Sequence, residues 1–245
     1  MSCLHLRVRR VSPVLVWTGM GEVPKDIGPS VVTLGNFDGV HRGHRAVLNT
    51  VVAQGTALAL MSVAVTFHPH PIAVLRPDLA PPMISSLRQR IGLLEATGLD
   101  AVLVLEFTKE FAAQTPEEFV TSVFVDALGA DLVVVGEDTR FGARNSGSVD
   151  TLRELGQRLG FRVIVLEDIG EGGRWSSSRA REMVAAGDVR GAAEVLGRPH
   201  RVDGLVVHGD HRGRLLGFPT ANLGGDVDGM VPQDGVYAGW LTMLD

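Results

Sequence analysis

Two histidines, His41 and His44, stand three positions apart in the segment GNFDGVHRGH at residues 35–44. Histidine suits phosphate binding or proton transfer, because a protonated imidazole donates two hydrogen bonds and titrates near neutral pH. Gly43 between them lets the backbone approach a ligand closely. A metal site and a plain polar turn are the alternatives, but no third and fourth ligand with suitable spacing stands nearby. We therefore predict a catalytic or phosphate-binding role for both histidines.

A strand and a helix must position this pair. The apolar run at 31–34 predicts a buried parallel strand closed by Gly35, and apolar residues at helical spacing predict a helix over 43–55. The turn between them holds Asn36 and Asp38. Unpaired backbone N–H groups and the positive end of a helix dipole meet at this turn, so we expect an anion there, namely a phosphate.

A second polar group is WSSSRAR at residues 175–181. Ser176 or Ser177 is suited to cap a helix, whereas Arg179 and Arg181 place positive charge at the helix start, where it opposes the dipole. A bound anion removes this conflict, and arginine pairs strongly with phosphate. We predict a polyphosphate ligand shared with the two histidines, with simple capping as the alternative.

Two further loops follow predicted strands. TFHPHP at 66–71 ends a strand predicted over 57–67, and its prolines predict an extended, rigid segment with no helix. GEDTRFG at 136–142 combines an acidic pair, Arg140 and Phe141, a mixture suited to an aromatic or ribosyl ligand. Ligands bind at the carboxyl edge of open α/β sheets, which favours a binding role for these loops. Ordinary surface turns are the alternative.

Alternating strands and helices define the fold class. Strands are predicted at 31–34, 57–67, 101–107, 131–136 and 161–166, and helices at 43–55, 87–97, 115–129 and 149–159. This alternation implies right-handed crossovers and a doubly wound parallel α/β sheet with helices on both faces.

The pattern changes near Gly197-Arg198-Pro199. Short strands are predicted at 202–207, within 209–223 and at 235–244, so a second, all-β domain begins near Arg198. Its roughly 48 residues are fewer than a β domain usually needs to form a stable core unaided.

Composition narrows the class of protein. The chain has 245 residues, a net charge of −5 and one cysteine, Cys3. With this net negative charge, the composition gives no reason to expect nucleic acid or an anionic membrane as a partner. No apolar run reaches the roughly 20 residues of a membrane helix. The lone cysteine fits a reducing cytoplasm, and residues 1–12 lack the pattern of an export signal. We expect a cytoplasmic protein with a peripheral N-terminal extension and make no prediction of its oligomeric state.

Taken in order, these motifs resemble the prokaryotic bifunctional riboflavin kinase/FAD synthetase family. The similar segments are GNFDGVHRGH at 35–44, TFHPHP at 66–71, GEDTRFG at 136–142, SSSRAR at 176–181, LGRP at 196–199 and GRLLGFPTANL at 213–223, followed by Pro232 and GVYAG at 235–239. The resemblance implies an N-terminal extension at 1–15, a Rossmann-like FMN adenylyltransferase domain at 16–197 and a truncated, incomplete β-barrel riboflavin kinase module at 198–245.

The resemblance also implies two reactions. ATP phosphorylates riboflavin to FMN in the second module, and the first module transfers AMP from ATP to FMN and releases pyrophosphate, both with Mg²⁺. The implied catalytic residues are His41, His44 and Arg181; the implied ATP-binding residues are Gly35, Asn36, Phe37, Asp38, Gly43, Ser176 and Ser177; the implied flavin-binding residues are Phe67, His68, Pro69, His70, Pro71 and Asp138; and Thr220 with Asn222 would hold Mg-ATP in the kinase module. No metal-binding side chain is assigned in the first module.

Three departures from the family pattern affect these expectations. Thr139 stands where the family usually has phenylalanine, and Ala180 stands where its Ser-Ser-Thr-x-Ile-Arg motif has isoleucine. The kinase of this family uses a glutamate base well after the PTAN loop, whereas no glutamate follows Glu194 here. We therefore expect adenylyl transfer to FMN without riboflavin phosphorylation. The alternatives are a non-catalytic flavin- or nucleotide-binding protein and a nucleotidyltransferase for another phosphate substrate.

Overall fold

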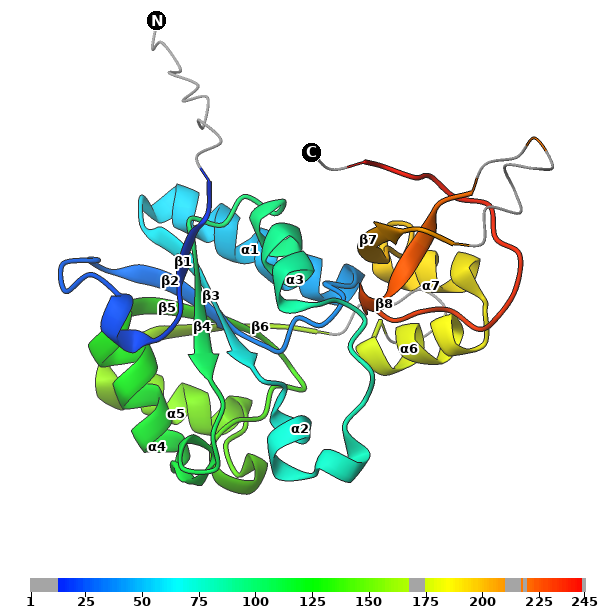
Figure 1. Ribbon diagram of the computed structural model, residues 1–245. Coiled ribbons are helices and arrows are strands. Elements are labelled where there is room, and N and C mark those ends of the chain that lie inside the picture. The colour runs from blue at the N-terminus through cyan, green and yellow to red at the C-terminus, as the bar shows by residue number, and fades with distance from the viewer. Residues whose placement is uncertain (1–12, 168–174, 210–216, 218–219, 244–245) are drawn as a thin grey trace, which may run out of the picture. The chain divides into compact units, whose positions relative to one another are not determined.

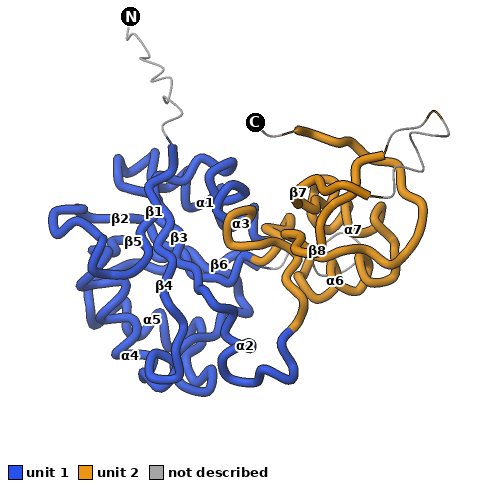
Figure 2. Tube along the Cα trace, viewed as in Figure 1, with its two compact units in different colours: residues 1–37, 44–80, 91–168 blue, residues 38–43, 81–90, 169–245 orange. Residues whose placement is uncertain are grey.

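The computed structural model describes residues 13–167, 175–209, 217 and 220–243 (Figure 1). The chain divides into two compact units, coloured separately in Figure 2. Unit 1 comprises residues 1–37, 44–80 and 91–168, and unit 2 comprises residues 38–43, 81–90 and 169–245. The short segments 38–43 and 81–90 thus group with the C-terminal part of the chain, while the domain limits expected from the family resemblance stay predictions.

A parallel sheet forms the centre of unit 1. Its described strands are β1 (Leu15–Trp17), β2 (Ser30–Leu34), β3 (Met61–His68), β4 (Ala101–Glu106), β5 (Ala130–Gly136) and β6 (Arg162–Leu166), in the order β1-β4-β3-β2-β5-β6. Each neighbouring pair is parallel. The predicted α/β class is confirmed for this unit, and β1 is an edge strand that the sequence pattern did not predict.

The strand order reverses beside β2. From β2 the chain continues to β3 and then β4 on one side, whereas β5 and β6 lie on the other side. Val32 of β2 pairs with Val63 of β3 and with Val133 of β5. A reversal of this kind opens a crevice at the carboxyl ends of the strands, where ligands of open α/β sheets bind. β2 therefore delivers the start of the following turn, residues 35–37, to the switch point of the sheet.

The helices connect these strands (Figure 1). They are α1 (Arg42–Leu58), α2 (Pro71–Leu75), α3 (Leu87–Glu95), α4 (Pro116–Phe119), which continues as a π-helical segment over Val120–Ala127, and α5 (Val149–Leu159). Thr115 and Glu118 form a capping box at the start of α4, with Pro116 in the first helical position. Both features stabilise a helix start, as expected there.

The predicted end of α1 at Gly55 is wrong, because the helix continues to Leu58 and β3 begins at Met61 instead of residue 57. Gly55 lies buried inside the helix, and a Cβ atom there would lie 2.9 Å from the carbonyl oxygen of Leu60. The glycine therefore permits close packing of the following turn against the helix and does not end it.

The expectation that no helix forms within 66–71 is wrong at Pro71, the first residue of α2. His70 caps this helix: its Nδ1 atom accepts a hydrogen bond from the backbone N–H of Ile72 at 3.2 Å. Proline is well tolerated in the first helical position because no helical hydrogen bond requires its missing N–H.

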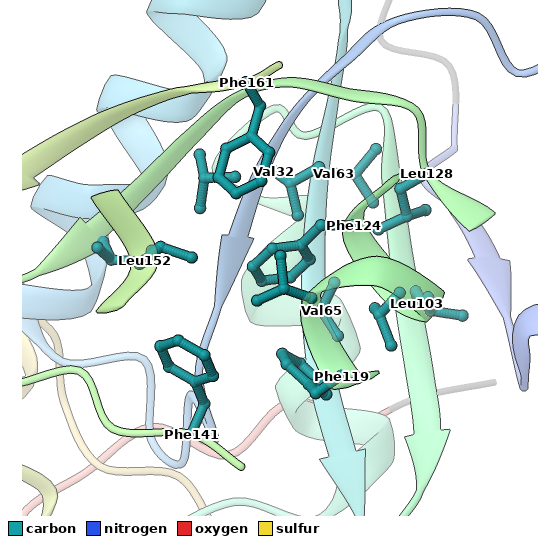
Figure 3. Close-up of a cluster of buried hydrophobic side chains, with 14 of the residues drawn as sticks. Val32, Val63, Val65, Leu103, Phe119, Phe124, Leu128, Phe141, Leu152 and Phe161 are labelled. Carbon is teal, nitrogen blue, oxygen red and sulfur yellow. The ribbon is translucent and has the colours of Figure 1, made fainter. Parts of the chain in front are cut away.

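The main core lies in unit 1. Its buried side chains come from the sheet and from the helices and loops that cover one face; Figure 3 labels Val32, Val63, Val65, Leu103, Phe119, Phe124, Leu128, Phe141, Leu152 and Phe161. Phe119 packs edge-on against Phe124, with ring centroids 5.3 Å apart. This core fixes the strands whose ends carry the predicted ligand loops.

Unit 2 combines two helices with a β ribbon. Its described elements are α6 (Ser177–Ala185), α7 (Val189–Leu196) and the antiparallel strands β7 (Asp203–Val207) and β8 (Asn222–Asp228). Ile84, Ala180, Val195 and Leu196 form a small buried cluster. The described residues of the predicted kinase module form this ribbon, and a barrel is not confirmed.

The strand predicted over 235–244 is wrong for its described part, because residues 235–243 adopt no strand. Val236 and Trp240 are almost fully exposed, so the apolar residues of this segment are not buried on one face of a sheet. A strand needs a neighbour for its backbone groups, and the described ribbon consists of β7 and β8. The part of the strand prediction over 210–216 and 218–219 lies outside the described residues. No helix in the described ranges is long and apolar enough to cross a membrane.

Candidate active site

The turn after β2 is fixed to β3 within unit 1. The backbone N–H of Gly35 donates to the carbonyl oxygen of Val65 at 3.1 Å, and Thr66 Oγ1 donates to the carbonyl oxygen of Asn36 at 3.1 Å. Phe37 has φ +49 and is buried, and its ring lies so close to Gly35 that a Cβ atom there would lie 3.0 Å from it. Gly35 therefore permits Phe37 to fold back under the turn.

His44 lies in the first turn of α1 and is half-buried. Its imidazole meets the ring of Phe37 edge-on, with centroids 5.1 Å apart and an interplanar angle of 73°. The packed phenyl ring restricts the orientation of the imidazole. Phe37 thus acts on this predicted catalytic residue through packing.

Asp38 is the polar centre of unit 2. Its carboxylate is 1% exposed and accepts hydrogen bonds from the backbone N–H groups of Ile84 and Ser85, both at 3.0 Å, and from Ser85 Oγ at 3.1 Å. Arg181 Nη2 donates to the same carboxylate at 2.8 Å, and Ser177 Oγ donates to the Asp38 carbonyl oxygen at 2.9 Å. Asp38 thereby joins the turn at 38–43 to the segment at 84–85 and to α6.

Arg181 has an anionic partner within the protein. A positive charge at the start of α6 is unfavourable without a nearby anion, and the carboxylate of Asp38 is that anion. The Arg181 Nε atom also donates to the carbonyl oxygen of Pro82 at 3.0 Å. The position of the guanidinium is therefore fixed by the protein, and its contact with pyrophosphate stays a prediction.

The serines at the start of α6 have separate structural roles. Ser176 is the N-cap, and its Oγ accepts a hydrogen bond from the N–H of Arg179 at 3.2 Å, which confirms the capping prediction. Ser177 holds Asp38 instead. The N–H group of Arg179 is used by this cap, so the earlier N–H groups of the first turn, which have no acceptor within a helix, are the ones placed to donate to an anion.

His41, Arg42 and Gly43 lie beside Trp175 in unit 2. His41 is buried, and a Cβ atom on Gly43 would lie 3.2 Å from its ring and 3.5 Å from the Cβ of Trp175. The Arg42 guanidinium carbon lies 5.2 Å from the centroid of the Trp175 ring, a cation–π contact. The requirement for glycine at position 43 is thus steric. Sequence reasoning did not select Arg42 or Trp175, although an arginine between the histidines and an aromatic residue before the serines were visible signals.

Arg90 is a second cation that sequence reasoning missed. It lies in α3 and is 1% exposed. Burial lowers the pKa of its guanidinium, and the negative charge of Asp38 opposes that shift. A buried arginine near Asp38 adds positive potential around the turn at 38–43.

The predicted flavin loop follows β3 in unit 1. Phe67 packs against Phe107 and Phe111, with ring centroids 5.4 and 5.9 Å away, whereas His68 and Pro69 are exposed. The peptide bond between these last two residues is cis. Phe67 therefore anchors the loop to the aromatic side chains beside it. His68 and Pro69 are the residues of this loop that are exposed to a ligand.

The loop after β5 carries Asp138, which is exposed. Phe141 from the same loop is buried against Phe119, with ring centroids 5.9 Å apart, so this aromatic side chain belongs to the core of unit 1. An aromatic residue in a loop can equally complete the core. Because β3 and β5 both neighbour β2, this loop and the loop at 66–71 flank the end of β2.

Asn222 is the first residue of β8, and Thr220 lies two residues before it; both are exposed, and their role toward Mg-ATP stays a prediction. Within the described ranges no group of three or more His, Cys, Asp or Glu side chains is placed to hold a metal ion. A hollow of about 480 Å³ in unit 2 is lined by residues such as Met83, Val227 and Met230 and by none of the predicted site residues.

A parallel α/β sheet whose strand β2 ends at the switch point and leads into a glycine-rich turn defines an α/β nucleotidyltransferase-like domain. Residues 23–180 match the family model described as FAD synthetase, and residues 196–245 match the model described as riboflavin kinase. The chain belongs to the bifunctional riboflavin kinase/FMN adenylyltransferase family.

Several curated relatives carry that name, and two of them illustrate the similarity. The protein from Escherichia coli K12 is 39% identical over 194 residues, which cover 79% of this chain and 62% of the relative. The protein from Bacillus subtilis is 36% identical over 219 residues, which cover 88% of this chain and 68% of the relative. This chain therefore spans about 62% of the length of the Escherichia coli relative.

A solved structure shares the fold. The crystal structure of a Streptococcus pneumoniae protein described as a macrolide-efflux protein aligns with a TM-score of 0.80 and 31% identity. The alignment covers 92% of this chain and 73% of the other. That description applies to the Streptococcus pneumoniae protein, and the similarity supports the fold of this chain.

Proposed function

We propose that this chain transfers the adenylyl group of ATP to FMN and so forms FAD and pyrophosphate. The observation that carries the proposal is the turn at 35–44, which leaves β2 at the switch point of the sheet and continues into α1. The match of residues 23–180 to FAD synthetase supports it.

In the proposed reaction, a phosphate oxygen of FMN attacks the α-phosphorus of ATP, and the bond from that phosphorus to the bridging oxygen breaks. Pyrophosphate leaves in line with the attacking oxygen, and no protein nucleophile is needed. The chain must align two anions and stabilise the charge that develops on the leaving oxygens.

We assign that stabilisation to His41, His44 and the start of α6. Each imidazole donates hydrogen bonds to the triphosphate, and Gly43 keeps the backbone between them free of a side chain that would crowd the His41 ring. The first-turn N–H groups of α6 and the guanidinium of Arg181 bind the leaving pyrophosphate. Asn36 and Asp38 hold the turn, as their contacts support.

FMN is assigned to the exposed side chains of the two loops beside β2. His68, Pro69 and Asp138 offer flat and polar contacts to a flavin. Magnesium, bound mainly through phosphate oxygens, would neutralise charge on the triphosphate.

Riboflavin kinase activity is the second reaction named for the relatives. Riboflavin supplied with Mg-ATP, with FMN formation as the measured product, tests whether this polypeptide also carries that reaction.

The main assay incubates the chain with FMN, ATP and MgCl2 and separates the flavins by chromatography. We expect FAD and pyrophosphate in equal amounts. FMN binding without FAD at high enzyme concentration would overturn the proposal in favour of a binding protein.

A further inference from the structure

Arg198 follows α7 and binds the backbone of the turn at 38–43 within unit 2. Its Nη2 atom donates to the carbonyl oxygen of Gly39 at 2.6 Å, and its Nη1 atom donates to the carbonyl oxygens of Val40 at 3.1 Å and Leu196 at 3.2 Å. Gly197, with φ +71, ends α7 and directs the chain into this position. One guanidinium thus holds two consecutive carbonyl groups of the turn.

The held residues have an unusual backbone conformation. Gly39 has φ +74, and Val40 has φ +39 with a side chain that is 1% exposed. Positive φ is rare for a β-branched residue, and such a conformation persists only where the surrounding structure enforces it. Strain of this kind accumulates at functional sites, and the two bonds from Arg198 are among the contacts that enforce it here.

Peptide geometry determines where the partner N–H groups point. In a trans peptide the C=O and N–H bonds lie in one plane and point in opposite directions. Because the carbonyl groups of Gly39 and Val40 point toward Arg198, the N–H groups of Val40 and His41 point away from it. Two successive N–H groups on the same side of a turn can donate to one anion.

We propose that Arg198 is a positioning residue that turns the N–H groups of Val40 and His41 toward the triphosphate of ATP. The proposal rests on the proposed function, because it identifies how that same site is oriented. Arg198 acts through the backbone and does not touch the substrate. It lies in the segment 196–245 that matches riboflavin kinase, so a residue of that segment shapes the loop used for adenylyl transfer.

The motif LGRP at 196–199 by itself indicates only a junction between modules. The three carbonyl contacts assign the arginine of that motif a specific task, because a planar fork of donors suits several fixed acceptors better than a lysine ammonium does.

The test compares Arg198→Ala and Arg198→Lys with the control Arg201→Ala. Arg201 is exposed and pairs with Asp203, outside the turn. In FAD synthesis we expect Arg198→Ala to lower kcat by about tenfold. We also expect an unchanged KM for FMN, little recovery in Arg198→Lys and partial recovery of the alanine variant on addition of guanidinium ion. The control should match the wild type.

Pyrophosphate binding, measured by calorimetry without turnover, separates this proposal from the proposed function. We expect the Kd for pyrophosphate to rise about tenfold in Arg198→Ala and to stay constant in Arg201→Ala. If the wild type makes no FAD but shows this dependence on Arg198, the proposed function fails and the positioning role stands. Wild-type kcat and pyrophosphate affinity in Arg198→Ala would overturn the positioning role, as would equal losses of FMN and pyrophosphate binding that follow the loss of folded protein.

Discussion

Replacing Asp38 by asparagine removes one charge from the buried polar centre of unit 2 while keeping the shape of the side chain. One carboxylate oxygen accepts from the N–H of Ile84 and from Arg181, and the other accepts from the N–H and the hydroxyl of Ser85. Whichever way the new amide turns, its NH2 group faces two donors. Two hydrogen bonds and an ion pair are therefore lost together.

The expected cost follows from burial. Asp38 is 1% exposed and the Arg181 side chain is 14% exposed, so water replaces the lost acceptor poorly. Breaking one partner of a buried pair costs about 3–5 kcal/mol. The matched control is Asp150→Asn: its pair with Arg153 is exposed at both side chains and contributes at most about 0.5 kcal/mol.

Urea unfolding followed by circular dichroism measures the two free energies of unfolding. The reasoning predicts a large loss for Asp38→Asn, a small one for Asp150→Asn, and a strongly non-additive double variant of Asp38→Asn with Arg181→Met. A loss below about 1 kcal/mol for Asp38→Asn would show that this carboxylate does not hold the turn.

Three further predictions concern other elements. His44→Ala should lower the rate of FAD synthesis by more than about tenfold with an unchanged circular dichroism spectrum, and an unchanged rate would remove its catalytic role. Burial lowers the pKa of His200 below 6.5. As the pH falls through 6.5, the unfolded state therefore binds more protons than the folded state, and the free energy of unfolding should decrease. His200→Asn should flatten this pH dependence, measured by urea unfolding. Gly156→Ala should destabilise α5, because the new Cβ atom would lie 2.6 Å from the Phe161 carbonyl oxygen, whereas Gly92→Ala in open space should stabilise α3 by about 1 kcal/mol; thermal unfolding that ranks the two glycine variants the other way would contradict this.

Local signals predicted most of unit 1. α5 begins and ends as predicted, because Ser148 caps its start and Gly160, with φ +90, ends it. β1 was missed because its apolar run, Leu15–Trp17, is only three residues long, which is too short to distinguish a strand from a loop by pattern alone. Its pairing with β4 depends on residues far along the chain.

The parts of the candidate site that could be predicted are those formed by residues close together in the sequence. The serine cap of α6 and the glycine-rich turn after β2 are visible as short motifs. The partners of Asp38 are not, because Ile84 and Arg181 lie 46 and 143 positions away. The same limit applies to Arg198, whose acceptor Gly39 is 159 positions distant.

Apolar patterning misled at the C-terminal end of the described chain. Residues 235–243 have the composition of a strand, yet Val236 and Trp240 are exposed and no ladder forms. Period and composition indicate that a segment is compatible with a strand, whereas the strand itself requires a partner.

The fate of labelled phosphate tests the central claim most directly. The chain is incubated with Mg²⁺, FMN and ATP labelled either at the α- or at the γ-phosphate, and the products are separated by chromatography. Adenylyl transfer predicts that the α label appears in FAD and the γ label in pyrophosphate, with both signals reduced in His44→Ala. FAD without label, or no FAD at all while FMN is bound, would contradict the assignment of this site to adenylyl transfer.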